Sequence, residues 1–136
     1  MIQAEIARVA TCRCGEPRVT CIGEPVRVPV CHCLAYQKRS GIAFAVEARW
    51  PNELVDLTGD VREHEQAGGS GTSATFNFCP RCGATVAFTS AGVPSVTAVL
   101  VGEFADPSLP SPQFSVYEKR KHRWAAVLGN EVERWD

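Results

Sequence analysis

Short apolar runs separated by glycine and proline dominate the pattern along the chain. Val26–Val30 and Ala84–Phe88 alternate apolar side chains with polar or small ones, as strands with one buried face do. Strands are predicted at Ile6–Thr11, Arg18–Ile22, Val26–Val30, Ala43–Ala48, Leu54–Leu57, Ser73–Phe78, Ala84–Thr89 and Val96–Gly102. Only Cys33–Ser40 and His122–Leu128 are predicted to form a turn or two of helix. This pattern indicates an all-β fold of short antiparallel hairpins.

Length and composition narrow the class of protein. The 136 residues fit one domain, 1–136, because neither a repeat nor a linker interrupts them. The formal net charge of -1 gives no general attraction to nucleic acid or to anionic lipid. No apolar run approaches the roughly 18 residues that span a bilayer, and Met1–Arg8 lacks the features of a signal peptide. We therefore expect a cytoplasmic protein that acts on neither membranes nor nucleic acid.

Cysteine is the residue type that changes this picture. The chain contains 7 cysteines, an odd number that argues against a complete set of disulfides. Because cytosolic thiols stay reduced, clustered cysteines there more often bind metal or react.

Two cysteine pairs predict one structural metal site. Cys79 and Cys82 are separated by two residues, a spacing that lets both thiolates bind one tetrahedral ion at about 2.3 Å. Cys12 and Cys14 form a second pair, and each pair is followed by a glycine. Four thiolates from two distant pairs make a closed zinc site, which is the structural kind. A redox dithiol is the alternative, but no βαβ context accompanies the Cys-x-x-Cys spacing.

Cys31 and Cys33 form a third pair, which is a weaker signal by itself. A catalytic zinc ion needs three protein ligands and one open position, and two thiolates do not supply them.

The cysteine motifs together resemble the family of glutathione-dependent formaldehyde-activating enzymes, which includes centromere protein V. The resemblance implies the zinc-stapled, all-β Mss4-like fold over nearly the whole chain. It is carried by Cys12–Gly15, Cys31–Gly41 and Phe78–Gly83, and it continues through Val101–Pro107, Ser115–Glu118 and Lys121–Trp124.

The resemblance also implies two zinc sites. The structural ligands of the family fall on the four cysteines already paired, Cys12, Cys14, Cys79 and Cys82. The catalytic zinc of the family is held by Cys-x-Cys-x-x-Cys, whose first two positions match Cys31 and Cys33. The third position is Tyr36, and a phenol with a pKa near 10 is not a usual zinc ligand.

Three outcomes for the second zinc site follow from Tyr36. The site is empty, or it recruits Cys21 or His32, or a thiol substrate supplies the missing sulfur. Cys21 lies in a strand-like segment and is expected to be a buried core thiol. In an extended segment, His32 faces away from the cysteines on either side of it, which favours a solvated or hydrogen-bonded side chain over a ligand.

The activity implied by the resemblance joins glutathione and formaldehyde, and in reverse it is a carbon–sulfur lyase reaction. Cys31 and Cys33 would then be the catalytic residues, acting on a small thiol and a small aldehyde. Lys38 and Arg39 are candidates for binding anionic glutathione, with ordinary solvated surface as the alternative. A non-catalytic zinc scaffold that binds a small thiol or a protein partner is the competing hypothesis.

The remaining segments carry weaker signals. Ala67–Gly71 lacks the residues of a phosphate-binding loop, and Pro107–Pro112 is predicted to cross the surface. The basic run Lys119–Arg123 is expected to be a solvated face, with Trp124 packed against the core. His64 and His122 are expected at the surface, and exposed strand edges would be compatible with a homodimer.

Overall fold

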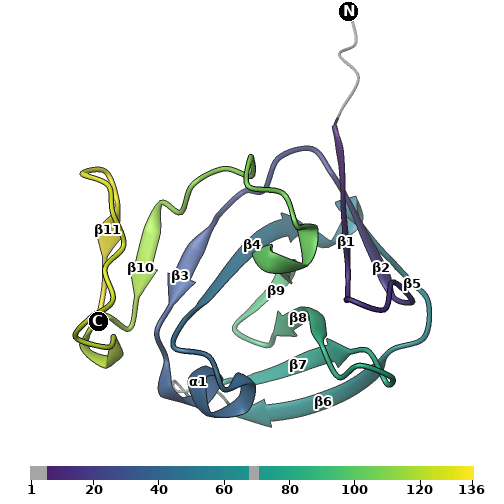
Figure 1. Ribbon diagram of the computed structural model, residues 1–136, viewed down its shortest axis with the longest axis horizontal. Coiled ribbons are helices and arrows are strands. Elements are labelled where there is room, and N and C mark those ends of the chain that lie inside the picture. Colours follow the sequence, from purple (N-terminus) through teal and green to yellow (C-terminus); the bar gives the residue numbers. More distant parts are fainter. Residues whose placement is uncertain (1–5, 68–70) are drawn as a thin grey trace, which may run out of the picture.

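Figure 1 shows the computed structural model, which describes residues 6–67 and 71–136. Strands dominate this part of the chain, accompanied by one short α-helix and three 3-10 helices (η). The elements are β1 (Ala7–Thr11), β2 (Arg18–Ile22), β3 (Pro29–Cys31), α1 (Leu34–Ser40), β4 (Ala45–Pro51), η1 (Asn52–Leu54), β5 (Val55–Thr58), β6 (Arg62–Ala67), β7 (Ser73–Phe78), β8 (Thr85–Ser90), β9 (Val93–Leu100), η2 (Val101–Phe104), β10 (Phe114–Val116), η3 (Glu118–Arg120) and β11 (Glu133–Arg134). The predicted all-β class is confirmed.

The described strands form two sheets. The smaller sheet has the order β1-β2-β5, and the larger has the order β11-β10-β3-β4-β9-β8-β7-β6. The pairs from β4 through β9, β8 and β7 to β6 are all antiparallel. Strand β10 runs parallel to both of its neighbours, β3 and β11, so this edge of the large sheet adds parallel pairs to the antiparallel ones.

Two apolar clusters pack against the large sheet. One joins the small sheet to the large one and contains Val19, Cys21, Trp50, Val86 and Val99. The Trp50 indole N–H donates to the carbonyl of Gly23 at 3.0 Å, so this large side chain is buried without losing its hydrogen bond. The other cluster packs α1 against the middle of the large sheet and contains Cys31, Cys33, Tyr36, Ala45, Phe76, Phe88 and Ala98.

The helix α1 has a capping residue at each end. The Cys33 sulfur accepts a hydrogen bond from the Tyr36 backbone N–H at 3.3 Å, a cap at the start of the helix. Gly41 ends the helix in the left-handed conformation, with φ of 77°, and its N–H donates to the Gln37 carbonyl at 2.8 Å. These two caps fix Cys33 and Tyr36 one turn apart on the same side of the helix.

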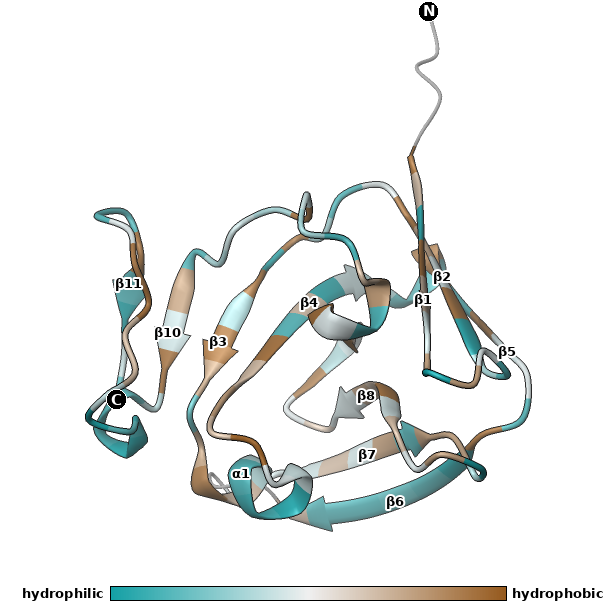
Figure 2. Cartoon of the chain, in the orientation of Figure 1, coloured by the Kyte–Doolittle hydropathy of each residue, from teal (hydrophilic) through white to brown (hydrophobic). Residues whose placement is uncertain are grey.

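The sequence missed one long strand, β6. Its residues, Arg62–Ala67, are almost all polar and exposed, and Figure 2 shows the strand in teal along its length. Strand β6 lies at the edge of the large sheet, paired with β7 alone. Charged side chains at an edge discourage pairing with another chain, but they leave no alternating pattern in the sequence.

Two further predictions were wrong. The strand expected over Val26–Val30 is interrupted at Val28, whose N–H donates to the Gln113 side chain. Regular strand therefore covers only Pro29–Cys31, while Arg27 forms an isolated bridge with Arg49 of β4. His122–Leu128 forms only an isolated turn, in which the Ala125 N–H bonds the His122 carbonyl at 3.0 Å. Trp124 is 72% exposed and does not pack against the core.

The outer segments fit the other expectations. His64 and His122 are exposed, and Pro107–Pro112 crosses the surface without regular structure. Most of the glycine-rich Ala67–Gly71 lies outside the described residues. None of the helices in residues 6–67 and 71–136 is long and apolar enough to cross a membrane.

Candidate functional site

Four cysteine sulfurs meet where two turns of the chain approach each other. Cys12 and Cys14 lie in the turn between β1 and β2, and Cys79 and Cys82 lie in the turn between β7 and β8. Their four sulfurs all lie within 4.8 Å of one another. The Cys12–Cys14 pair is separated by 3.2 Å and the Cys14–Cys79 pair by 3.4 Å. The fold therefore brings together the four cysteines whose pairing was predicted from the sequence.

The two turns have the same local geometry. Gly15 donates its N–H to the Cys12 carbonyl at 3.0 Å, and Gly83 donates to the Cys79 carbonyl at 2.9 Å. Both glycines have positive φ, 81° and 80°, a conformation that other residues rarely adopt. The backbone N–H groups of Cys82 and Arg81 donate to the Cys79 sulfur and lower the pKa of that thiol to about 6.

This donor set fits a zinc ion. A tetrahedral ion with sulfur ligands at 2.3 Å places neighbouring sulfurs about 3.8 Å apart, close to the spacing seen here. Cys12 and Cys79 are buried, whereas Cys14 and Cys82 are exposed, so an ion can enter from one side. Four thiolates leave no open position, which makes this a structural site rather than a catalytic one.

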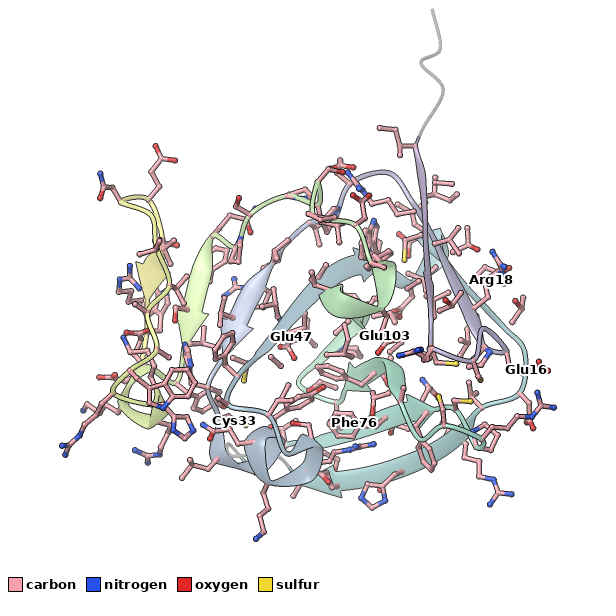
Figure 3. The ribbon with its side chains drawn as sticks, in the orientation of Figure 1. Glu16, Arg18, Cys33, Glu47, Phe76 and Glu103 are labelled. Atoms are coloured by element: carbon pink, nitrogen blue, oxygen red, sulfur yellow. The ribbon has the colours of Figure 1, made fainter. Side chains whose placement is uncertain are left out.

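A second cysteine pair lines a small pocket on the other side of the molecule. Cys31, Cys33, Tyr36 and Glu47 all line a cavity of about 150 Å³, which we call the thiol pocket. All four side chains are buried, and Phe76 and Phe88 supply an apolar wall. Figure 3 shows Cys33, Glu47 and Phe76 around the space between α1 and β4, whereas Glu16 and Arg18 mark the distant β1–β2 turn.

Burial raises the pKa of three ionisable groups of the thiol pocket, Cys31, Tyr36 and Glu47. Hydrogen bonding to Cys33, burial and the nearby Glu47 all raise the pKa of Cys31 far above its usual value. Burial and the charge of Glu47 raise the pKa of Tyr36 as well. Glu47 is 4% exposed, and burial raises its pKa to about 7 despite the guanidinium of Arg49 at 3.4 Å. In this environment both Cys31 and Tyr36 remain protonated at neutral pH.

The protein residues of the thiol pocket do not fit a second zinc site of the three-thiolate kind. In the motif that the family resemblance implies, Tyr36 stands at the third cysteine position, and burial raises the pKa of its phenol above that of a free tyrosine. Among the described residues, only the four-cysteine cluster brings three or more such ligand atoms within 4.8 Å of one another.

Neither replacement ligand considered from the sequence reaches the thiol pocket. Cys21 is 0% exposed within the apolar cluster between the two sheets, where burial raises the pKa of its thiol to about 12. It is the core thiol that the sequence predicted. His32 is also 0% exposed, and its Nε2 lies 2.9 Å from the Ser115 hydroxyl on β10.

His32 belongs to a buried polar network that ties β10 to the start of α1. Ser115 donates in turn to the Glu118 carboxylate, which lies 3.3 Å from the Lys121 ammonium. Burial lowers the pKa of His32, although the charge of Glu118 opposes this effect. The hydrogen-bonded role predicted for His32 is therefore correct, and the solvated alternative is wrong.

A larger pocket lies on the other side of Tyr36. It has a volume of about 460 Å³ and shares Tyr36 with the thiol pocket. Arg39 and Glu103 are its charged residues, and Ile42, Phe44 and Leu100 supply apolar walls. Lys38, the other basic residue considered from the sequence, is exposed on α1 and does not line this pocket. Only Arg39 of the two basic residues is therefore placed beside a cavity.

Glu47 and Glu103 are the site residues that sequence reasoning missed. Glu47 occupies an inward position in the alternating strand β4, where a charged residue interrupts apolar neighbours. That interruption was the available signal, since a carboxylate at a buried strand position needs a reason to be there. Glu103 lies in η2, and no pattern in the sequence separates it from a surface residue.

Comparisons with known proteins agree with this geometry. The family model described as "Glutathione-dependent formaldehyde-activating enzyme" matches residues 7–120. The fold is similar to that of a Rhodobacter sphaeroides protein solved in a structural genomics programme, with a TM-score of 0.57 and 16% identity. That match covers 94% of this chain and 99% of the other. No curated protein matches the chain.

Proposed function

Because the chain belongs to the family of glutathione-dependent formaldehyde-activating enzymes, we propose that it adds a small thiol to a small aldehyde, or cleaves the adduct. This is a carbon–sulfur lyase reaction, with glutathione and formaldehyde as the substrates that the family name indicates. The observation that supports it is the pair Cys31 and Cys33, buried in a pocket beside the acidic Glu47.

The reaction needs no oxidant. The substrate sulfur forms a bond to the carbonyl carbon, the carbonyl electron pair moves to oxygen, and the proton of the thiol ends on that oxygen. Tyr36 and Glu47 are oxygen acids of the same pocket, so either is placed to hold or donate the proton. In the reverse direction the hydroxyl proton leaves, the carbon–sulfur bond breaks and the aldehyde is released.

Pocket size supports a small aldehyde. The thiol pocket, at about 150 Å³, admits only a few non-hydrogen atoms. The bulk of a thiol such as glutathione needs the larger pocket of about 460 Å³ beyond Tyr36. Arg39 lies there to attract an anionic group, and Lys38 adds positive charge from the exposed face of α1.

Zinc belongs to the proposal at the four-cysteine cluster. An ion there would supply no reactive position, but it would hold the turn before β2 against the turn before β8. Catalysis at Cys31 and Cys33 would then depend on the pocket residues of this chain, because the third thiolate of a second zinc site is absent. A cytoplasmic location agrees with reduced cysteines.

A non-catalytic zinc scaffold that binds a small thiol or a protein partner is the second candidate. Tyr36 favours it, because the phenol packs against Phe76 and Phe88, with ring centroids 5.8 Å and 6.1 Å away, and fills the space of a ligand. A scaffold of this kind would bind thiols without catalysing their addition to aldehydes.

Exchange spectroscopy separates the two candidates. Purified protein with a measured zinc content would be added to glutathione and ¹³C-formaldehyde, and the exchange rate between free and bound carbon would be followed by NMR. We expect about one zinc per chain and faster exchange than in buffer. The double variant Cys31→Ser/Cys33→Ser should lose the acceleration and keep its zinc.

Matched controls make the result specific. Cys21→Ala removes a buried thiol outside the pocket and should leave exchange unchanged in the folded fraction. No acceleration by folded, zinc-loaded protein would support the scaffold instead. About two zinc ions per chain would show that Cys31 and Cys33 hold a second ion with a ligand from outside the protein.

A further inference from the structure

The larger pocket contains two opposite charges that form no ion pair with any residue in the described part of the chain. Arg39 and Glu103 both line it, yet neither takes part in an ion pair with any described residue. They also do not pair with each other, so their charged groups lie more than the 4.0 Å of a salt bridge apart. Charges that line a cavity without compensation point to a ligand that supplies it.

The guanidinium of Arg39 is held in place by an aromatic ring. Its central carbon lies 4.2 Å from the ring centroid of Phe76, a cation–π arrangement. The Nε of Arg39 is buried and makes no hydrogen bond within the described structure. An arginine fixed by stacking holds its terminal guanidinium N–H groups in a preformed arrangement that suits a carboxylate.

Glu103 presents the opposite charge from a different element. It lies in η2, directly after β9, and no described group donates a hydrogen bond or forms an ion pair with its carboxylate. Partial burial raises its pKa, which reflects the missing compensation. An ammonium group in the pocket would supply both the charge and the hydrogen bonds.

We propose that the larger pocket binds the α-amino acid head group of the thiol substrate, with its carboxylate on Arg39 and its ammonium on Glu103. The ligand class is a zwitterionic thiol, either a thiol amino acid or a peptide with a free γ-glutamyl head. Neutral thiols and thiols that carry only a carboxylate would leave Glu103 uncompensated and bind more weakly. As a statement about the substrate, this inference rests on the proposed function.

The position of Tyr36 gives the bound thiol a direction. Tyr36 lines both pockets, so in this proposal a ligand with its head between Arg39 and Glu103 would extend its sulfur past Tyr36 towards Cys31 and Cys33. Phe44 and Ile42 line the same pocket and offer apolar contact to the ligand. Head-group recognition is thereby separated from the reacting sulfur.

Binding measured without reaction tests this assignment. The zinc-loaded protein would be titrated by calorimetry or NMR with S-methylglutathione, with its N-acetyl derivative and with the derivative whose γ-glutamyl α-carboxylate is an amide. The S-methyl group prevents reaction with aldehyde. We expect each modified head group to bind about tenfold more weakly or worse, since a hydrogen bond to a charged group contributes about 1.5–3 kcal/mol.

Variants connect each ligand group to one side chain. Glu103→Gln should weaken the binding of S-methylglutathione by about tenfold and leave the binding of its N-acetyl derivative nearly unchanged. Arg39→Gln should likewise weaken the binding of S-methylglutathione by about tenfold, and it should leave the binding of the α-amide derivative nearly unchanged. Lys38→Gln is the matched control, because Lys38 precedes Arg39 on α1 and lies outside the pocket. Circular dichroism and zinc content would confirm that the variants fold.

The outcomes distinguish this inference from the proposed function. Equal binding of all three ligands, no binding by wild-type protein, or equal weakening by Lys38→Gln would each overturn the head-group site. Binding that depends on the head group, without any aldehyde exchange, would support the head-group site and contradict the proposed lyase activity. If Arg39→Gln and Glu103→Gln exchange aldehyde and bind S-methylglutathione with wild-type affinity, the lyase proposal stands and the head-group site is wrong.

Discussion

The sulfurs of Cys14 and Cys79 lie 3.4 Å apart although 65 positions of sequence separate the two residues. The contact joins the turn before β2 to the turn before β8, so the small sheet and the large sheet are held at this point. A cross-link over such a loop restricts the unfolded chain, which is worth about 4 kcal/mol in the loop-entropy model. A metal ion bound to the four sulfurs would therefore contribute to stability as well as to local structure.

Replacing one cysteine of this cluster is expected to release the metal ion and so to remove the cross-link between the two turns. Cys82→Ser should lose most of the bound zinc and about 4 kcal/mol or more of unfolding free energy. Elemental analysis and urea unfolding would measure both. Arg81→Ala is the control, because Arg81 is exposed in the same turn and forms only a surface ion pair with Glu16. A zinc-free Cys82→Ser protein as stable as wild type would contradict the structural role.

Restoring a third sulfur to the thiol pocket should create a second zinc site. In Tyr36→Cys we expect about one additional zinc ion per chain, since three thiolates at the start of α1 complete a site with one open position. Tyr36→Ser leaves the same space between Phe76 and Phe88 without the sulfur and should not gain zinc. Equal zinc content in the two variants would show that the missing ligand is not what limits metal binding.

The hydrogen bond between His32 and Ser115 is expected to stabilise the contact between β10 and the start of α1. Ser115→Ala leaves Nε2 of the buried His32 without its 2.9 Å partner, and its Nδ1 already lacks one among the described residues. The loss should be about 1–3 kcal/mol of unfolding free energy. Ser108→Ala, on the exposed crossing before β10, should cost much less. Similar losses in the two variants would contradict this network.

Glu47 should make the protein less stable as the pH rises. Because burial raises its pKa from 4.5 to about 7, the folded state binds more protons than the unfolded state between these values. Stability is therefore lost as the pH rises from about 4.5 to 7, by about 1–3 kcal/mol. Glu47→Gln removes this dependence, so its stability relative to wild type should increase between pH 6 and 8.

Denaturant unfolding at several pH values would measure the Glu47 effect, with Glu53→Gln on the exposed η1 as the control. The window above pH 6 avoids the loss of zinc from protonated thiolates. A wild-type protein whose stability rises relative to Glu47→Gln over this window would show that the carboxylate is stabilised rather than strained by its surroundings.

The sequence pattern predicted the fold best where both ends of an element carry a local signal. Strands β2 and β7 were predicted with their observed bounds, because turn residues flank each run and its apolar positions alternate. The helix α1 was predicted to within its cap residue, since Cys33 and Gly41 mark its two ends. Strand β6 was missed because its pairing comes from β7 and not from any apolar face of its own.

The sequence by itself determined which four cysteines come together. Spacing and the glycines after each pair predicted which four sulfurs would meet, because metal ligands in tight turns must follow local rules of backbone geometry. The resemblance to the family also predicted that Tyr36 stands where a third cysteine is expected.

The tertiary structure alone decided which groups share a pocket. Glu47 joins Cys31 and Cys33 through the pairing of β3 with β4, and Glu103 joins Arg39 because η2 lies beside α1 across the larger pocket. Burial, which depends on every neighbour at once, then raises the pKa of Glu47 and leaves the Nε of Arg39 without a hydrogen-bond partner among the described residues. Neither effect is local in sequence, because each depends on the desolvation and the charges that distant segments impose.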